Sequence, residues 1–388
     1  QGITSENEGK EIIEMLAELP DLWDVNISDW SMDSATSRFE SEGYQEPYMA
    51  FVKSMTSKPV VGVGRFTSPD TMLSLIQRGV MDMIGAARPS IADPFLPKKI
   101  EEGREDEIRE CIGCNICVMS DELSVPISCT QNPTMGEEWR RGWHPERIEP
   151  SNSDDGVLVV GGGPAGLECA LALGQRGYRV ILAEASAELG GRVSRESRLP
   201  GLAEWGRVRD YRVLMLERMA NVSIYRENPL SADEIFEFSA EDQFDYSHVL
   251  LANGSSWRRN GLGRIHREPI PGLDKLKVFT PDDIMDGVLA KGRVVVFDDD
   301  HFYMGGVLAE KLRREGHDVL LVTPAPDIST WTHKTLEQRK IQKQLMDLGV
   351  ELATQTNLTA AETGKVELSC IFTERKIERE CDSLLLVT

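Results

Sequence analysis

The chain has 388 residues, about two to three times the length of a typical domain, so it should carry more than one core. It holds 43 Lys and Arg against 64 Asp and Glu, and the net charge of −21 disfavours nucleic acid and anionic membrane surfaces as partners. No stretch approaches the roughly 20 apolar residues of a membrane span, and the start QGITSENEGK lacks a signal-peptide core. We expect a multidomain cytoplasmic protein that binds neither nucleic acid nor membranes.

The first hundred residues alternate helical and strand patterns. Helical apolar spacing at 6–19 precedes the strand candidate DLWDVNIS, and helical spacing at 44–57 and 69–78 comes before the further strand candidates PVVGVGRF and VMDMIGAARP. This βαβαβ order predicts a parallel sheet covered by helices, either a barrel or an open doubly wound sheet, with chemistry at the carboxyl ends of the strands. The chain begins at Gln1 and ends on the buried-strand pattern DSLLLVT, so we expect both ends to be cut.

A second part begins after the loop SNSDDG, which marks a domain boundary near residue 150. The run DGVLVVGGGPAGLECALALGQRGYRVILAEAS predicts a strand, a glycine turn, a helix and a strand, and RVVVFDDDHFYMGGVLAEKLRREGHDVLLVTPA repeats this outline. The runs DYSHVLLANG (245–254) and ECDSLLLVT (380–388) are similar exit strands. We expect domains at 151–285 and 286–380, with 381–388 returning as a strand to the first of them.

Four of the seven cysteines lie within nineteen residues, as CIGCNICVMSDELSVPISC. Cys111, Cys114 and Cys117 follow C-x2-C-x2-C spacing, and Cys129 can supply a fourth ligand, which favours a 4Fe–4S cluster over zinc or disulfides. Such a one-electron relay requires an electron source in the same protein. The other cysteines, Cys169, Cys370 and Cys381, are scattered and suit reduced thiols.

Two strand ends suggest that source. GVGRF and GAARPS each expose backbone amides and then carry an arginine, as do the phosphate-binding loops after the last two strands of a (β/α)8 barrel. We expect Gly64, Arg65, Ala87 and Arg88 to hold the phosphate of FMN. Two ordinary surface turns are the alternative, and the neighbouring cysteine motif favours the flavin.

The run VVGGGPAGLE matches G-x-G-x-x-G at Gly161, Gly163 and Gly166, between a strand and a helix. Glu184 ends the next strand, where it can accept a hydrogen bond from a ribose hydroxyl. Arg192, in ELGGR, adds a cation near the same place. These residues predict a site for ADP or FAD.

The repeated turn departs from this pattern. Asp298, Asp299 and Asp300 stand where the glycine turn should admit a pyrophosphate, which three carboxylates would repel. We expect this module not to bind NAD(P), and we assign Gly305 and Gly306 to close helix packing.

A candidate substrate site follows the strand DVNIS. Asp33 is a candidate general base or cation anchor, and the Trp30 ring suits an alkylammonium. Turn and capping roles are the alternative for these residues and for Asp29. His144, in RRGWHPE, is more consistent with a structural than a catalytic role.

Taken in order, DLWDVNISDW, SRF, PVVGVGRF, IGAARPSIADPFLP, CIGCNIC, SCTQNPTMGEEWRRGWHPE and GGGPAG resemble the trimethylamine dehydrogenase family along the whole chain. The resemblance implies an α/β protein with the C-terminal part of an FMN-binding TIM barrel at 1–105, a 4Fe–4S segment at 106–150 and two Rossmann-like domains of the flavin disulfide reductase type. By the same resemblance, Arg88 matches the phosphate-binding arginine, the four cysteines match the cluster ligands, Asp33 matches the active-site aspartate and Trp30 matches one tryptophan of the substrate bowl.

The sequence also departs from that family's trimethylamine enzyme. The segment before Asp33 is shorter, and Asp121 or its neighbours replace a second bowl tryptophan. A less aromatic site suggests a more polar substrate, with dimethylglycine-like amines ahead of trimethylamine. Other family features, including a covalent flavin cysteine and a Tyr–His pair, would lie before Gln1.

The resemblance leaves three functions open. The first is oxidative N-demethylation of a small methylated amine, with electrons passing from FMN through the cluster to an electron-transfer flavoprotein, in a protein that is a homodimer when full length. The second is an NAD(P)H-dependent reductase of the 2,4-dienoyl-CoA reductase type, which the acidic second turn disfavours. The third is an inactive electron-transfer and nucleotide-binding fragment.

Overall fold

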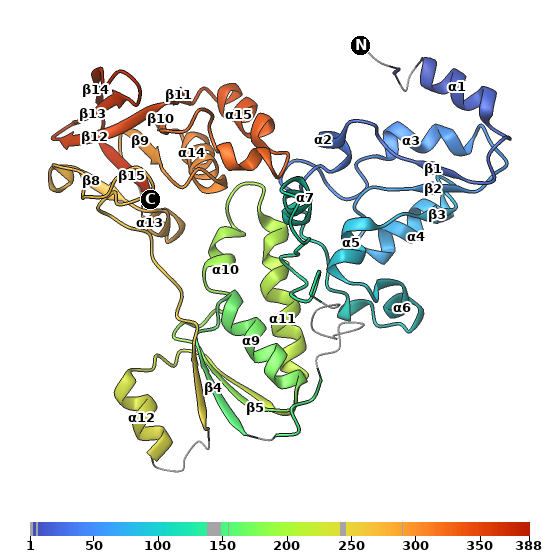
Figure 1. The fold of residues 1–388 in the computed structure, drawn as a ribbon, viewed down its shortest axis with the longest axis horizontal. Helices are drawn as coiled ribbons and strands as arrows, with labels where there is room; N and C mark the ends of the chain where they lie inside the picture. Colours follow the sequence, from blue (N-terminus) through green and yellow to red (C-terminus); the bar gives the residue numbers. More distant parts are fainter. Residues whose placement is uncertain (1–2, 5–6, 138–148, 154, 241–245, 289) are drawn as a thin grey trace. The chain divides into compact units, whose positions relative to one another are not determined.

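A computed structural model describes residues 3–4, 7–137, 149–153, 155–240, 246–288 and 290–388. The chain divides into two compact units, one of Gln1–Ser151 and Asp210–Met219, the other of Asn152–Arg209 and Ala220–Thr388. In the described residues, the strands form four sheets. Figure 1 shows their elements, coloured by residue number.

The first unit alternates strands and helices, as its apolar pattern predicts. Its sheet has the order β1–β2–β3, and both strand pairs are parallel. The elements are β1 Trp23–Val25, β2 Val60–Gly62, β3 Met83–Ile84, α1 Glu8–Leu16, α2 Trp30–Asp33, α3 Glu46–Lys53, α4 Pro69–Gln77, α5 Ala87–Ala92 and α6 Leu96–Glu101. A buried cluster that includes Val52, Val60, Phe66, Leu75 and Met81 forms the core.

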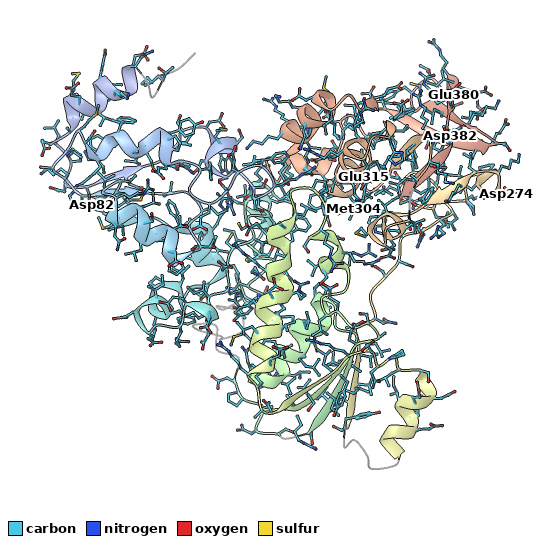
Figure 2. The ribbon with its side chains drawn as sticks, turned by 180° about the vertical axis from the view of Figure 1, so that it is seen from behind. Asp82, Asp274, Met304, Glu315, Glu380 and Asp382 are labelled. Carbon is cyan, nitrogen blue, oxygen red and sulfur yellow. The ribbon has the colours of Figure 1, made fainter. Side chains whose placement is uncertain are left out.

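The register of this sheet brings its functional loops to one edge. Val25 pairs with Gly62, and Gly62 pairs with Ile84, so the three strands end at the same level. Asp82, labelled in Figure 2, accepts from the Val60 amide at 2.8 Å and so helps to hold the start of β2. Because parallel strands share their carboxyl edge, the segments that follow β1, β2 and β3 begin side by side.

The cysteine segment follows in the same unit. It contains the 3₁₀ helix η1 Glu105–Glu107 and the helix α7 Ile116–Glu122, which carries Cys117 on its first turn. Asn115, just before α7, has φ of 57°, in the left-handed region that asparagine tolerates better than most residues. The expectation for His144 lies outside the described residues.

The second unit contains two parallel sheets. The first has the order β6–β5–β4–β7. Its elements are β4 Gly156–Val160, β5 Arg179–Ala183, β6 Val222–Tyr225, β7 His248–Leu251, α9 Pro164–Gln175, α10 Arg192–Glu196, η2 Ala203–Gly206, α11 Arg207–Glu217 and α12 Ala232–Ala240. Residues 210–219 of the α11 region group with the first unit.

The second parallel sheet has the order β11–β10–β9–β15–β8, beside an antiparallel sheet β12–β13–β14. Its elements are β8 Lys277–Phe279, β9 Arg293–Asp298, β10 Asp318–Val322, β11 Glu351–Ala353, β15 Ser383–Val387, η3 Leu273–Lys275, α13 Pro281–Met285, α14 Tyr303–Arg314, η4 Thr330–His333 and α15 Gln338–Asp347, with β12 Thr356–Glu362, β13 Lys365–Cys370 and β14 Lys376–Glu380. Val295, Phe297, Leu320, Leu384 and Leu386 belong to one buried cluster.

The strand expected in 381–388 is β15, which lies between β9, in the range predicted for the second nucleotide-binding-like domain, and β8, in the range predicted for the first. The predicted domain bounds stay a prediction. Asp382, labelled in Figure 2, accepts from the Arg293 amide at 2.8 Å where β15 and β9 begin. The place beside β4 is held by β7. The two exit strands therefore repeat each other in position as well as in sequence, one in each sheet.

Candidate functional site

The edge where β1, β2 and β3 end opens into a cavity of about 380 Å³ in the first unit. All six residues predicted for the flavin and substrate sites line it: Trp30, Asp33, Gly64, Arg65, Ala87 and Arg88. Cys117 and Asp121, from helix α7, also line it. One hollow thus joins the predicted phosphate loops, the candidate aspartate and one of the four clustered cysteines.

The loop after β2 has a constrained backbone. Gly64 approaches its surroundings closely, because a Cβ there would lie 2.9 Å from Phe66 Cζ and 3.1 Å from Gly43 Cα. Arg65 has φ of 55°, is 5% exposed and donates from Nη2 to Glu40 O at 2.6 Å. A left-handed conformation at a residue other than glycine is uncommon and is often retained where it shapes a binding site.

The loop after β3 runs directly into helix α5 at Ala87, so the first amides of α5 have no acceptor within the helix. Arg88 donates from Nη1 to Asn115 Oδ1 at 2.8 Å and to Ala35 O at 3.0 Å. It also donates from Nη2 to Asp33 O at 3.3 Å. Arg88 therefore joins three segments around the cavity, while its role as a phosphate ligand stays a prediction.

The candidate aspartates have different surroundings. Asp29 caps helix α2, since its Oδ1 accepts from the amides of Ser31 at 2.9 Å and Met32 at 3.3 Å, so the capping alternative explains this residue. Asp33 Oδ1 accepts from Gln45 Nε2 at 3.1 Å and faces the cavity wall with Trp30, which is 48% exposed.

Two residues that belong to this wall or support it, Gln45 and Asn115, are not predicted by the sequence motifs. Gln45 is 1% exposed and also accepts from the Ile27 amide at 3.4 Å, and no spacing pattern marks it. Asn115 is 2% exposed and donates from Nδ2 to Ser34 O at 2.5 Å. Its position inside the cysteine motif, where a tight loop needs a left-handed residue, could have singled it out.

None of the four cysteines forms a disulfide, and each is partly exposed. Burial, with smaller contributions from Cys111 and Cys129, raises the pKa of Cys114 to about 12 and that of Cys117 to about 11. Backbone amides point at two sulfurs: Gly113 N lies 3.4 Å from Cys111 Sγ, and Gln131 N lies 3.4 Å from Cys129 Sγ. Amide donors to sulfur are typical of iron–sulfur ligands.

In the described residues, no group of three or more His, Cys, Asp or Glu side chains is arranged to hold a single metal ion. Cys111 and Cys129 each affect the pKa of Cys114 and of Cys117, so the four thiols lie near one another, while the cluster itself stays a prediction.

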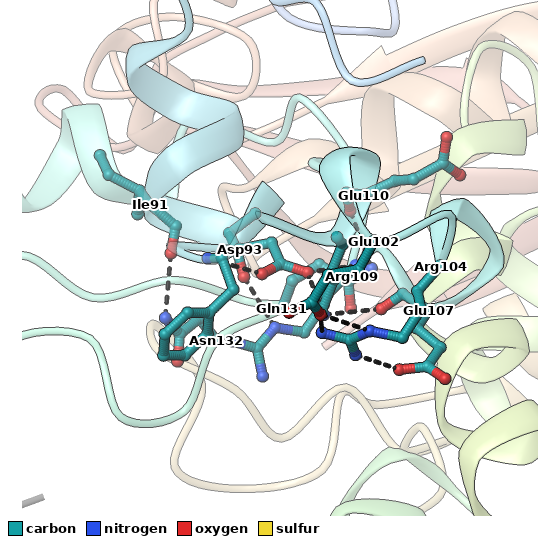
Figure 3. Close-up of polar contacts among 12 residues, drawn as sticks. Ile91, Asp93, Glu102, Arg104, Glu107, Arg109, Glu110, Gln131 and Asn132 are labelled. Atoms are coloured by element: carbon teal, nitrogen blue, oxygen red, sulfur yellow. Dashed lines mark hydrogen bonds and ion pairs between the residues drawn. The ribbon is translucent and has the colours of Figure 1, made fainter. Parts of the chain in front are cut away.

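Polar contacts fix both flanks of the cysteine segment to the end of helix α5 (Figure 3). Asp93 is 1% exposed, and its Oδ2 accepts from Lys99 Nζ at 2.5 Å and from the Arg109 amide at 2.8 Å. On the other flank, Asn132 Nδ2 donates to Ile91 O at 3.0 Å. The helix whose N-terminus faces the cavity thus also anchors the cysteine segment at its C-terminus.

The second unit has its own cavity of about 460 Å³, lined by Gly161, Gly163, Glu184 and Arg192 among others. Gly161 has φ of 106°, and a Cβ there would lie 2.3 Å from Ala252 O. A Cβ at Gly163 would meet no atom within 4 Å, which leaves room for a ligand. Gly166 serves packing, because a Cβ there would lie 1.8 Å from Gly161 O. These are the three roles of a dinucleotide turn.

The polar residues of this cavity are engaged with the protein. Glu184 accepts from Gly162 N at 2.6 Å and from Ser186 N at 2.8 Å. Burial acts to raise its pKa, but these hydrogen bonds outweigh burial and keep the pKa below its usual value. Arg192 donates to Ser255 O at 2.6 Å and lies over the Trp257 ring, with 5.5 Å between its Cζ and the ring centroid.

The repeated turn at the end of β9 is filled by its own carboxylates. Asp298 and Asp299 are at most 1% exposed, and Asp298 Oδ1 accepts from the amides of Asp300 at 3.1 Å and His301 at 3.0 Å. Burial raises the pKa of Asp298 to about 7. Gly305 packs against it, since a Cβ there would lie 2.5 Å from Asp298 Cγ. The Asp298 carboxyl therefore accepts hydrogen bonds from the backbone amides that a pyrophosphate would need as donors.

A buried pair links the two parallel sheets' helices within the second unit. Tyr303, at the start of α14, donates from its hydroxyl to Glu196 Oε2 at 2.6 Å, and Glu196, at the end of α10, is 6% exposed. The Trp205 ring lies edge-on to Tyr303 with centroids 4.7 Å apart. Burial raises the pKa of Glu196.

Comparison with known proteins gives two family matches. Residues 2–107 match the NADH:flavin oxidoreductase / NADH oxidase family, and residues 155–388 match the pyridine nucleotide-disulphide oxidoreductase family. Dimethylamine dehydrogenase of Hyphomicrobium sp. (strain x) is 41% identical over 100% of this chain and 56% of its own length. These matches confirm the predicted fold class. In the described part of the chain, no helix has the length and apolar content to cross a membrane.

Two solved structures are also similar. The 6-hydroxypseudooxynicotine amine oxidase of Pseudomonas geniculata N1 is 52% identical with a TM-score of 0.95, over 99% of this chain and 57% of its own. Histamine dehydrogenase of Rhizobium sp. 4-9 is 50% identical with a TM-score of 0.94, over 98% of this chain and 55% of its own. The chain thus spans about half the length of these relatives.

Proposed function

Because this chain belongs to the trimethylamine dehydrogenase family, we propose that it takes part in the oxidation of a small amine by an iron–sulfur flavoprotein. The observation that supports this proposal is a cavity lined by Gly64 and Arg88 of the predicted phosphate loops, by Asp33, and by Cys117 of the cysteine segment. A flavin bound there would lie against both the substrate site and the cysteine segment.

The residues present fit the implied groups. The loop at Gly64 and Arg65 and the first turn of α5 offer backbone amides and arginines to the FMN phosphate. The four cysteines offer thiolates to a 4Fe–4S cluster, and because burial raises the pKa of Cys111, Cys114 and Cys117, iron binding would have to release their protons. When bound, FMN supplies two-electron acceptance and the cluster supplies one-electron transfer.

The chain's own residues then bind and orient the amine. The half-exposed Trp30 ring presents a face to an alkylammonium. Asp33, held by Gln45, orients the amine and takes a proton from its nitrogen, which frees the lone pair that loss of a hydride from the neighbouring carbon requires; FMN, when bound, would accept that hydride. The four cysteines would hold a cluster that supplies one-electron transfer toward an electron-transfer flavoprotein, and we propose that the full-length protein is a homodimer.

The substrate class follows from a second carboxylate in the cavity wall. Asp121 lines the cavity with Asp33, so two negative groups face the bound molecule. They attract a cationic amine and repel a substrate carboxylate. We therefore place amines with a second cationic or hydrogen-bond-donating group first, methylated amines next, and dimethylglycine-like amines last, which reverses the order expected from the sequence.

The second unit holds ADP or FAD in this proposal. The open space at Gly163 and the close packing at Gly166 suit a pyrophosphate on the N-terminus of helix α9. The NAD(P)H-dependent reductase remains the second candidate, and the buried Asp298 at the repeated turn weighs against it.

One experiment tests the proposal. The holoprotein is prepared anaerobically, assayed for iron, sulfide and flavin, and mixed with amines while flavin absorbance is followed. We expect about four iron and four sulfide per chain, FMN, and bleaching by an amine. Zinc without sulfide, or flavin that only NADPH bleaches, would refute it. Cys129→Ser should lose iron, whereas Cys370→Ser, at the end of β13, should retain it.

A further inference from the structure

We propose that Arg212 is a positioning residue for the cysteine-bound cluster, which it serves by holding Gln131 against Cys129 and by placing a buried positive charge nearby. The inference rests on the proposed function for the presence of the cluster. It concerns a residue outside the cysteine motif and some eighty positions further along the chain.

The contacts form a short path to the sulfur. Arg212 is 3% exposed and donates from Nη1 to Gln131 Oε1 at 2.9 Å and from Nη2 to Gln131 O at 3.1 Å. Gln131 is 1% exposed, and its backbone amide points at Cys129 Sγ, 3.4 Å away. The planar guanidinium therefore fixes the orientation of the residue that donates to the ligand.

Gln131 also connects the two ends of the cysteine segment. Its Nε2 donates to Glu110 O at 3.0 Å, and Glu110 directly precedes Cys111 (Figure 3). Residues on both sides of the ligand set are thus held by one side chain, which Arg212 holds in turn. Loss of Arg212 would loosen the first and the last ligand together.

The charge has a predictable effect on the cluster's redox equilibrium. Reduction adds negative charge to a cluster that already carries four thiolates, and a buried cation stabilises that charge in a low-dielectric interior. Arg212 supplies such a cation on the Cys129 side through its two bonds to Gln131, so its removal should lower the reduction potential.

The chain offers a matched control on the same stretch of residues 210–219. Arg218 pairs with Asp106 and, at 3.3 Å, with Glu107, just before the cysteine segment, but its side chain is 41% exposed. Substitution of Arg218 by glutamine removes one positive charge from the same stretch and leaves the contacts of Gln131 intact. Its field at the cluster is screened by solvent.

The test is a reductive titration of the holoprotein, followed by the electron paramagnetic resonance signal of the reduced cluster. In Arg212→Gln the ratio of reduced to oxidised cluster, at the potential where the wild-type cluster is half reduced, should fall about tenfold, which is 59 mV for one electron. In Arg212→Lys, which keeps the charge, this ratio should fall less. Arg218→Gln should match the wild type.

A wild-type potential in an Arg212→Gln protein with full iron and sulfide would overturn the inference, as would an equal shift in Arg218→Gln. If Arg212→Gln does not retain iron, Gln131→Ala decides, because it keeps Arg212, the backbone amide and the backbone carbonyl but removes the side-chain acceptor Oε1 and the bond to Glu110 O. A fully loaded Gln131→Ala protein with an unchanged potential and spectrum would then overturn it. Absence of a cluster in the wild type would instead refute the proposed function.

Discussion

Arg88 donates from Nη1 to Asn115 Oδ1 at 2.8 Å, and this bond joins the loop after β3 to the cysteine motif. Asn115 also binds a third segment, since its Nδ2 donates to Ser34 O at the end of helix α2. The loop after β3, the cysteine loop and the segment that carries Asp33 are therefore held together by two side chains. Neither side chain has to touch the substrate to fix the shape of the cavity.

The first prediction concerns Asn115. Asn115→Gly keeps the left-handed backbone but leaves buried partners without their hydrogen bonds, so it should lower the stability of the first unit by about 1–3 kcal/mol. Asn115→Ala should cost about 1–2 kcal/mol more, because alanine resists this conformation. Denaturant unfolding monitored by the cluster absorbance would measure both.

Ser124 is the control, because it also has a left-handed backbone, with φ of 55°, but is exposed. Ser124→Ala should show the strain cost, while Ser124→Gly should be close to neutral. If Asn115→Gly is as mild as Ser124→Gly, the bonds from Asn115 do not hold the cavity together.

The sequence carries much of this fold because its signals are local. Apolar runs, glycine turns and helical spacing mark β4, α9 and β5, and the repeat marks β9, α14 and β10. The placement of β15 could not be read from its own residues, because a buried apolar strand fits either sheet equally well, and only pairing with β8 and β9 decides it.

The site shows the same division between local and distant signals. The cysteines and glycines follow fixed spacings, so their sequence positions are informative. Gln45, Arg212 and Glu196 act through contacts between residues far apart in the chain, and polar side chains of these types are common on surfaces. Their burial, which makes them important, depends on packing that no short pattern encodes.

The second prediction compares the two aspartates of the α2 region. Asp33→Asn removes the carboxylate that faces the cavity, and kcat/KM for an amine with an artificial electron acceptor should fall about 10²–10⁴-fold. Asp29→Asn keeps a good helix cap and should retain nearly all activity. Equal losses in both variants would indicate a structural role for Asp33, and an unchanged rate in Asp33→Asn would remove it from the mechanism.

The third prediction is a pH dependence of stability from Glu196. Its folded pKa is raised chiefly by burial and by Asp282, against opposing effects of Tyr303, Arg192 and Arg195. Between the ordinary glutamate pKa and the raised one, the unfolded chain is ionised while the folded protein holds its proton, so stability falls as pH rises. Glu196→Gln has no carboxyl to ionise, so it does not lose stability in this way. Its thermal midpoint should therefore rise relative to that of the wild type as pH increases from about 4.3.

Glu234 provides a comparison of opposite sign. Hydrogen bonds from Ser231 lower the pKa of Glu234, so the contribution of Glu234 to the stability of the folded protein increases as pH rises. The thermal midpoint of Glu234→Gln should therefore fall relative to that of the wild type as pH rises over the acidic range. Thermal unfolding at a series of pH values would record both differences. A gap between Glu196→Gln and wild type that does not change with pH would contradict the assigned effect of burial.

The fourth prediction separates the two nucleotide turns. ADP should raise the thermal midpoint of the second unit by binding at Gly161 and Gly163, whereas NADH should neither raise it through the Asp298 turn nor bleach the flavin. Gly163→Asp would place a carboxylate in the open space of the first turn and should abolish the ADP effect. Rapid bleaching by micromolar NADH in a stopped-flow trace would favour the reductase alternative.

The last prediction concerns the substrate and depends on Asp121. Two carboxylates in the cavity wall should favour an amine with a second cationic or donor group, so histamine should exceed dimethylamine and trimethylamine in kcat/KM, and dimethylglycine and sarcosine should be slowest. Asp121→Asn keeps the size of the side chain and removes its charge. We expect it to lower kcat/KM for histamine about tenfold, equivalent to about 1.4 kcal/mol, while changing trimethylamine little. Formaldehyde release would identify N-demethylation among the methylated amines. If dimethylglycine leads the panel, or if Asp121→Asn slows histamine and trimethylamine equally, Asp121 does not select the substrate by its charge.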